Sequence, residues 1–177
     1  MAQWTETKVG RILARSRMFS PMLCVLPRCN WAGDEADLLV LTRTCKLVDV
    51  EIKISRPDFR ADKKKSKWYT HQRGWFVDGV WQQRPPIKRE WPRRIWKHFY
   101  AIPAEVWRDD LLEHAQPNSG ILLISEPEYG DQGVRVLRQA VYNSEAKPLL
   151  PEEVMQIARL ATLRLWDAYK RLEAHER

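Results

Sequence analysis

The chain has 177 residues and a formal net charge of +7, which is the length of one compact domain with room for an insertion. Hydrophobic residues make up 44% and charged residues 30%, which excludes a disordered chain, and no apolar run is long enough to span a membrane. Three cysteines make a poor disulfide framework, and the N-terminal segment lacks the apolar core of a secretory signal, so the sequence predicts a cytoplasmic protein with reduced thiols.

The first third of the chain predicts a helix followed by three strands, at residues 5–16, 22–26, 37–41 and 47–54. A turn over residues 42–45 joins the last two strands into a hairpin. A second helix is then predicted from Arg56 to about Gln72, because Pro57 and Asp58 are typical of a first helical turn.

The rest of the chain predicts further strands around an insertion. Asp78-Gly79 is typical of a tight hairpin turn, and apolar pairs flank it, so residues 74–95 predict an inserted basic hairpin. Strands follow at 98–102, 120–125 and 134–137, with a short helical piece at 104–113. A C-terminal helix over 151–174 carries the apolar stripe Val154, Ala158, Ala161, Leu165, Ala168 and Leu172. The pattern predicts a single α/β domain over residues 1–177, with a mixed central sheet flanked by helices.

The positive charge is concentrated in one part of the chain. Residues 53–97 contain 14 Lys or Arg against four acids, interleaved with tryptophan, tyrosine and phenylalanine. This combination suits a phosphate backbone with bases beside it, so a nucleic acid is the predicted partner, ahead of an acidic protein or a membrane surface. The sequence contains no GxGxxG, Walker, GxSxG or HExxH motif, which excludes the enzyme classes that depend on them.

Two carboxylates of the predicted hairpin carry the chemistry. Side chains alternate along the strand 47–54, so Leu47, Asp49, Glu51 and Lys53 share one face, and the valines and isoleucines between them form the core face. If the turn centres near Thr44, Asp37 lies across from Glu51, with Cβ atoms roughly 5 Å apart. The alternative is that Glu51 and Lys53 simply face solvent on the open side of a strand that is buried on its other side.

Carboxylates this close repel unless a cation lies between them. Mg²⁺ prefers oxygen ligands and commonly takes one or two protein carboxylates, so a divalent metal suits this pair. Lys53, on the same face, is close enough to reach a phosphate oxygen or a metal-bound water. On this reasoning, replacing either Asp37 or Glu51 by its amide is expected to remove repulsion and stabilise the metal-free protein.

Asp37 followed by Glu51-Ile52-Lys53 resembles the D...(D/E)xK signature of the PD-(D/E)XK nuclease superfamily, whose restriction-endonuclease-like fold has an αβββαβ core. The segments Glu51–Asp62 (EIKISRPDFRAD) and Phe99–Pro103 (FYAIP) are similar to the MmcB-like branch of DNA-repair-associated proteins. The resemblance spans about residues 5–140. The basic hairpin and Lys97-His98, where that branch tends to have an acid, depart from the pattern.

The resemblance implies a metal-dependent DNA endo- or exonuclease that acts in repair, recombination or mobile-element processing. Asp37, Glu51 and the main-chain carbonyl of Ile52 would bind Mg²⁺ or Mn²⁺, and Lys53 would orient the attacking water or stabilise the transition state. Glu6 is either a further metal ligand or a first-turn acid that serves the helix dipole. Glu35 is a second candidate ligand, but with one residue between it and Asp37 it is expected to point to the opposite face.

Phosphate contacts are expected from the residues that follow the signature, namely Ser55, Arg56, Arg60, Lys63, Lys64, Lys65 and Lys67. Two alternatives to a nuclease stay open. One is a catalytically silent nucleic-acid-binding protein of the same fold, and the other is a regulator that uses its basic face against an acidic protein.

Overall fold

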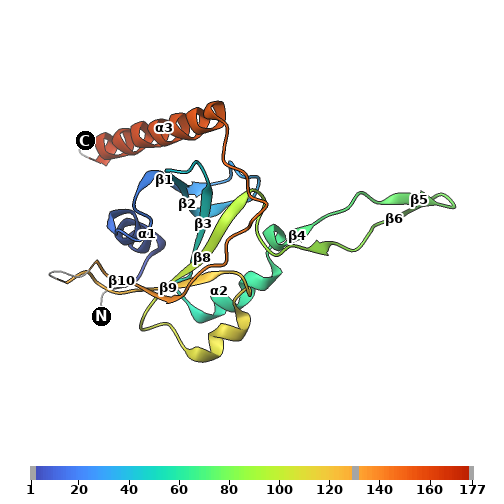
Figure 1. Ribbon diagram of the computed structural model, residues 1–177, viewed down its shortest axis with the longest axis horizontal. Helices are drawn as coiled ribbons and strands as arrows, with labels where there is room; N and C mark the ends of the chain where they lie inside the picture. The colour runs from blue at the N-terminus through green and yellow to red at the C-terminus, as the bar shows by residue number, and fades with distance from the viewer. Residues whose placement is uncertain (1–2, 129–131, 176–177) are drawn as a thin grey trace.

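The computed structural model describes residues 3–128 and 132–175, which form a six-stranded mixed sheet with helices on both faces (Figure 1). The strands lie in the order β1 (Met22–Cys29), β2 (Ala36–Thr42), β3 (Leu47–Ile52), β8 (Ile95–Pro103), β9 (Gly120–Ile124) and β10 (Val134–Arg138). β3, β8 and β9 are parallel, and the remaining neighbours are antiparallel. The predicted α/β class with a mixed central sheet is confirmed.

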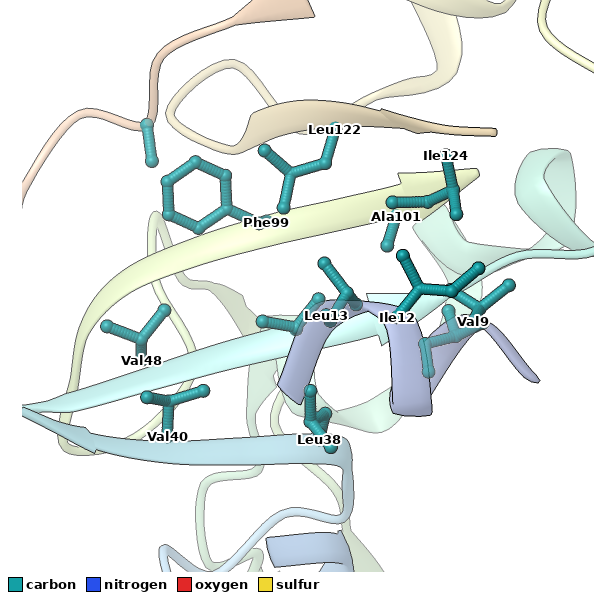
Figure 2. Close-up of a cluster of buried hydrophobic side chains, with 13 residues drawn as sticks. Val9, Ile12, Leu13, Leu38, Val40, Val48, Phe99, Ala101, Leu122 and Ile124 are labelled. Atoms are coloured by element: carbon teal, nitrogen blue, oxygen red, sulfur yellow. The ribbon is translucent and has the colours of Figure 1, made fainter. Parts of the chain in front are cut away.

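Helix α1 (Glu6–Arg15) covers one face of the sheet. Thr5 caps it by accepting a hydrogen bond from the amide of Lys8, and its apolar residues recur on one side. Figure 2 shows Val9, Ile12 and Leu13 of this side packed against side chains from β2, β3, β8 and β9, namely Leu38, Val40, Val48, Phe99, Ala101, Leu122 and Ile124. The valines of β3 therefore point toward α1, and its intervening residues point toward the opposite face.

The opposite face is covered by α2 (Arg56–Ala61) and the segment that follows it. The prediction of a helix as far as Gln72 is wrong after Ala61, since the chain continues in two 3₁₀ turns at Asp62–Lys64 and Ser66–Trp68. The physical reason is a buried polar anchor: the carboxylate of Asp62 accepts hydrogen bonds from the Trp68 indole and the Tyr100 hydroxyl. These bonds turn the chain inward, and Trp68 becomes a fully buried core residue.

The insertion begins earlier and ends earlier than predicted. Tyr69–Thr70 (β4) pairs with Ile87–Lys88 (β7), and Trp75–Val77 (β5) pairs with Val80–Gln82 (β6) farther out. The turn at Asp78-Gly79 has φ values of 50° and 77°, which confirms the tight hairpin turn. We call residues 69–88 the arm, and Figure 1 shows it projecting away from the sheet.

The end of the predicted insertion at residue 95 is wrong, because Ile95 is already the first residue of β8. Trp91 also belongs to the body of the protein, where its indole donates to the carbonyl of Val141.

The C-terminal helix α3 (Pro151–His175) packs against the sheet near β1 along its first half (Figure 1). Val154, Ile157, Leu160 and Ala161 contact the core. The predicted stripe is therefore correct at Val154 and Ala161 and wrong at its other positions, since Leu165 and Leu172, for example, are exposed. Within the described ranges, no helix is long and apolar enough to cross a bilayer.

Strand β1 continues through Pro27 to Cys29, beyond its predicted end at residue 26. A proline is tolerated here because β1 is an edge strand, so its open side has no neighbouring strand to which a backbone N–H would have to donate. Cys24, Cys29 and Cys45 are free thiols, as predicted.

Candidate metal centre

The hairpin register places Asp37 across from Glu51. β2 and β3 pair with Leu38 opposite Val50 and Leu41 opposite Leu47, the register that the turn near Thr44 predicts. The amide of Ile52 donates to Asp37 Oδ2 at 2.8 Å, which ties this carboxylate to the end of β3. Asp37 is half-buried, and Glu51 is buried.

The face of β3 opposite α1 is polar and is nevertheless buried. Asp49, Glu51 and Lys53 are each 2% exposed or less. β8 runs parallel beside β3, with His98 in register with Asp49 and Tyr100 with Glu51. Asp49, Glu51 and His98 therefore offer ligand atoms that lie within 4.8 Å of one another, a group that could hold a metal ion.

Three lysine side chains neutralise Glu51. Lys53 Nζ lies 3.1 Å from Glu51 Oε1, and Lys65 contacts the same oxygen. Lys67 contacts Oε2 and also donates to Asp49 Oδ2 at 3.0 Å. Lys67 is buried, so these carboxylates are its partners in the protein interior. The polar face is an ion-pair network rather than a set of isolated acids.

Asp62 is the second anionic centre of this network. Its Oδ2 accepts from Trp68 Nε1 at 3.0 Å and from the Tyr100 hydroxyl at 2.6 Å, and its Oδ1 lies 3.1 Å from Lys53 Nζ. Lys53 is therefore held between Glu51 and Asp62, with Asp58 Oδ1 at 3.4 Å as a further partner.

The charges of the network shift the pKa values in opposite directions. Burial alone would raise the pKa of Glu51, but the ammonium groups of Lys67, Lys53 and Lys65 outweigh burial and lower it below its usual range. Burial opposes the charge of Lys53, but Glu51 and the neighbouring aspartates raise its pKa above that of a free lysine. Lys53 therefore stays protonated and supplies a fixed positive charge.

Asp37 and Asp49 are shifted the other way. Burial, with the nearby Glu51 charge, raises the pKa of Asp37 to about 6. Burial also raises the pKa of Asp49 to about 6, against the opposing effect of the Lys67 ammonium. Both acids thus keep a proton more readily than a solvated aspartate, which is the expected state of carboxylates that share a site with another anion.

His98 is buried as a neutral imidazole. Burial and the Lys67 charge lower its pKa well below the usual value. Nδ1 lies 2.7 Å from Ser119 Oγ, and the tautomer that is protonated at Nδ1 leaves a lone pair on Nε2, which is 3.9 Å from Asp49 Oδ2. His98 Nε2 and Asp49 Oδ1 lack hydrogen-bond partners among the described residues. In that tautomer both atoms are buried acceptors without donors, whereas Asp49 Oδ2 accepts from Lys67, and such acceptors suit a bound cation.

A hollow of about 350 Å³ gives access to the centre. Its lining combines acids with the lysine-bearing segment, namely Asp34, Glu35, Asp37, Lys65, Ser66 and Lys67. Asp37 and Lys65 lead from this hollow to the buried carboxylate of Glu51. A phosphate group that enters the hollow would meet the ammonium groups of Lys65 and Lys67 and also the candidate metal ligand Asp37.

The predicted DNA contacts are placed in different environments. Ser55 caps α2, Arg56 donates to the carbonyl of Val106, and Arg60 pairs with Asp110 at 2.8 Å. Lys63 donates to the carbonyl of Glu113, and Lys64 is exposed.

The remaining two predicted contacts belong to the network itself. Lys65 is partly exposed and reaches both the hollow and Glu51. Lys67 is buried and pairs with Asp49 and Glu51, so it lies at the inner wall of the hollow and not on the outer surface of the protein.

The two extra acids considered from the sequence also differ. Glu6 lies in the first turn of α1, and its carboxylate is 3.5 Å from Arg28, a contact that suits the helix-dipole interpretation. Glu35 lines the hollow beside Asp37, contrary to the expectation that it points away. It precedes the first residue of β2, so strand alternation does not govern its direction.

No role in the site was predicted from the sequence for Asp49, His98 or Asp62. Strand alternation had already placed Asp49 on the face of Glu51, and that signal could have identified it. His98 reaches the centre through the parallel pairing of β3 with β8, and Asp62 through the end of α2, and both depend on contacts between distant parts of the chain.

The raised pKa of Asp37 predicts that Asp37→Asn stabilises the metal-free protein at pH 8. The folded state disfavours the ionised carboxylate, so the contribution of Asp37 to stability is present below a pH of about 3.8 and is lost as the pH rises through about 6. Because solvent screens a half-buried group, we expect a gain of about 1 kcal/mol, or about 2–4 °C in Tm. Asparagine keeps an acceptor for the Ile52 amide.

The measurement is a set of thermal melts in EDTA from pH 4 to pH 8. The Tm difference between Asp37→Asn and the parent should shrink toward pH 4. The control is Glu35→Gln, which changes an exposed acid of the same hollow and should melt like the parent. A gain that is the same at every pH would contradict the assignment.

No protein-family model matches the chain, and no curated protein matches it in sequence. Among solved structures, the SPO1766 protein of unknown function from Silicibacter pomeroyi is similar in fold, with a TM-score of 0.57 and 20% sequence identity. The alignment covers 93% of this chain and 91% of that chain. At this identity the likeness shows a shared fold.

Proposed function

We propose that the protein is a metal-dependent nuclease that hydrolyses phosphodiester bonds in DNA. The observation that carries the proposal is the pair Asp37 and Glu51 on adjacent strands at an open hollow, with Lys53 two residues beyond Glu51. The element order α1, β1, β2, β3, α2, β8 is consistent with the core of the PD-(D/E)XK nucleases that the motif resembles.

The donor atoms suit a divalent metal in two overlapping sets. Asp37, Glu51 and the Ile52 carbonyl offer oxygen atoms, which Mg²⁺ and Mn²⁺ prefer. Asp49, Glu51 and His98 offer two oxygens and a nitrogen, a set better suited to Mn²⁺ or another transition metal. When bound, such an ion lowers the pKa of a water and offsets charge on the phosphodiester.

The protein's own cations have separable roles in this proposal. Lys53 is buried and protonated, so it acts as a fixed positive charge for the developing oxyanion and not as a proton acceptor. Lys65 is partly exposed at the rim, where its ammonium group can exchange the Glu51 carboxylate for a substrate phosphate. Lys67 holds Asp49 and Glu51 in place from within the core.

A second candidate is a nucleic-acid-binding protein without catalysis. Both oxygens of Glu51 already contact lysine ammonium groups, and a metal would have to displace at least one of them. A protein that uses these lysines as permanent counter-ions would bind DNA through its basic surface and leave the phosphodiester intact.

The experiment is a cleavage assay on linear, circular, single-stranded and branched DNA with Mg²⁺ or Mn²⁺, and with EDTA as the metal-free arm. We expect cleavage that EDTA stops, and a loss of about 10²–10³-fold in Asp37→Asn. Calorimetry with Mn²⁺ should show weaker binding in the same variant.

Glu105→Gln, which changes an exposed acid outside the hollow, is the control and should cleave like the parent. Salt-dependent DNA binding without cleavage of any substrate under either metal would favour the second candidate.

A further inference from the structure

The arm exposes aromatic side chains on both of its faces. Cross-strand pairing places Phe76 beside Trp81 on one face and Trp75 on the other. Phe76 is 68% exposed and Trp81 51% exposed, although their ring centroids lie 5.0 Å apart in an edge-to-face contact. A two-stranded hairpin with its large apolar groups in water is marginal by itself, so these rings are suited to a binding partner.

Local geometry presents the rings as platforms. A Cβ atom at Gly74 would lie 2.6 Å from the Trp81 ring, so the indole lies directly against the glycine backbone and is still 51% exposed. On the opposite side of the hairpin, the Arg84 guanidinium lies 4.8 Å from the centroid of the Trp75 ring, which places a positive charge next to an aromatic surface.

The charge of the arm favours nucleic acid over protein as the partner. Residues 69–88 contain Arg73, Arg84 and Lys88 against a single acid, Asp78, at the tip. The exposed Lys64 lies a few residues before the arm begins. Phosphates suit these cations, and unpaired bases suit the open rings, whereas the bases of a duplex are already stacked on one another.

The root of the arm lies at the rim of the hollow. Arg89, directly after β7, donates to Thr70 Oγ1 at 2.6 Å and to Asp34 Oδ2 at 3.4 Å, and Asp34 lines the hollow. The amide of Arg89 also bonds to the carbonyl of Trp68 at 2.7 Å. A DNA strand that leaves the hollow can therefore continue along the arm.

We infer that the arm binds single-stranded DNA, with unpaired bases stacked on Phe76, Trp81 and Trp75 and with phosphates at the neighbouring arginines. The inference rests on the proposed function in that it names the substrate class, DNA with an unpaired segment. The binding itself requires no metal, since no arm residue belongs to the candidate metal centre.

The test is fluorescence anisotropy of a labelled 20-nucleotide poly(dT) strand and of a duplex of the same length, with full-length protein in EDTA. We expect the single strand to bind more tightly than the duplex. The double variant F76A/W81A should bind the single strand at least about tenfold more weakly, the loss of two stacked bases. F76L/W81L, which keeps apolar bulk without a ring, should lose as much.

The matched control is W166A, which removes a tryptophan that is 65% exposed on α3, and which should bind like the parent. Thermal melts should be unchanged, because the replaced side chains are outside the core. Parent-like affinity in F76A/W81A or in F76L/W81L would overturn the inference, and the former would assign the arm to a protein partner.

The two proposals fail separately. If the parent cleaves no DNA and the arm variants still lose single-strand affinity, the nuclease assignment is overturned and the arm assignment stands. If cleavage occurs and the arm variants bind like the parent, the reverse holds.

Discussion

Glu51→Gln is expected to lower the unfolding free energy of the metal-free protein by about 3 kcal/mol. The substitution removes the anion that Lys53, Lys65 and Lys67 share, and two of these ammonium groups are buried. Removing one partner of a buried ion pair leaves a charge without compensation, which typically costs several kcal/mol. The same substitution should abolish Mn²⁺ binding and cleavage, because both candidate ligand sets include Glu51.

This expectation reverses the one drawn from carboxylate repulsion alone. If repulsion alone mattered, both Asp37→Asn and Glu51→Gln would stabilise the protein. With the ion-pair network taken into account, we expect stabilisation from Asp37→Asn only. Guanidinium unfolding in EDTA should therefore place Asp37→Asn above the parent and Glu51→Gln below it at pH 8. Equal stability of Glu51→Gln and the parent would show that the lysines do not depend on Glu51.

The pH dependence provides a further check on Glu51. Its pKa is lowered in the folded protein, so its contribution to stability is present above a pH of about 4.5 and is lost as the pH falls through the lowered pKa. The deficit of Glu51→Gln should be largest near neutral pH and should shrink in acid, the opposite direction to the gain expected for Asp37→Asn.

Asp62→Ala is expected to destabilise the protein by about 3–5 kcal/mol. Three groups share the Asp62 carboxylate in the parent, the Trp68 indole, the Tyr100 hydroxyl and the Lys53 ammonium. Alanine removes that carboxylate from all three. A buried donor that loses its acceptor forfeits its hydrogen bond and remains cut off from water. Equilibrium denaturation at neutral pH measures the effect.

A surface aspartate supplies the matched control. Asp110 pairs with Arg60 in solvent, and Asp110→Ala should cost at most about 1 kcal/mol. Asp62→Asn, which keeps one acceptor, should lie between the alanine variant and the parent. If Asp62→Ala were as mild as Asp110→Ala, Asp62 would not organise the segment after α2.

Local pattern was enough to predict the carboxylate pair. The alternation of 47–54 and a turn near Thr44 are short-range properties, and together they determine which residues of a hairpin face each other. The same is true of the outer hairpin of the arm, β5 and β6, because Asp78-Gly79 specifies a tight turn and its flanking residues specify the strands.

Tertiary structure decided what surrounds that pair. Parallel pairing of β3 with β8 brings His98 and Tyr100 to the polar face across more than 45 residues of chain, and no periodicity in either segment encodes that register. The helix begun at Arg56 ends at Ala61 because Asp62 finds buried donors, a long-range gain that overrides local helix propensity. Lys67 was expected to contact phosphate at the surface, and in the structure it is a buried counter-ion of Asp49 and Glu51. Burying these two carboxylates is favourable only when a cation neutralises them, and the folded chain brings Lys67 to them.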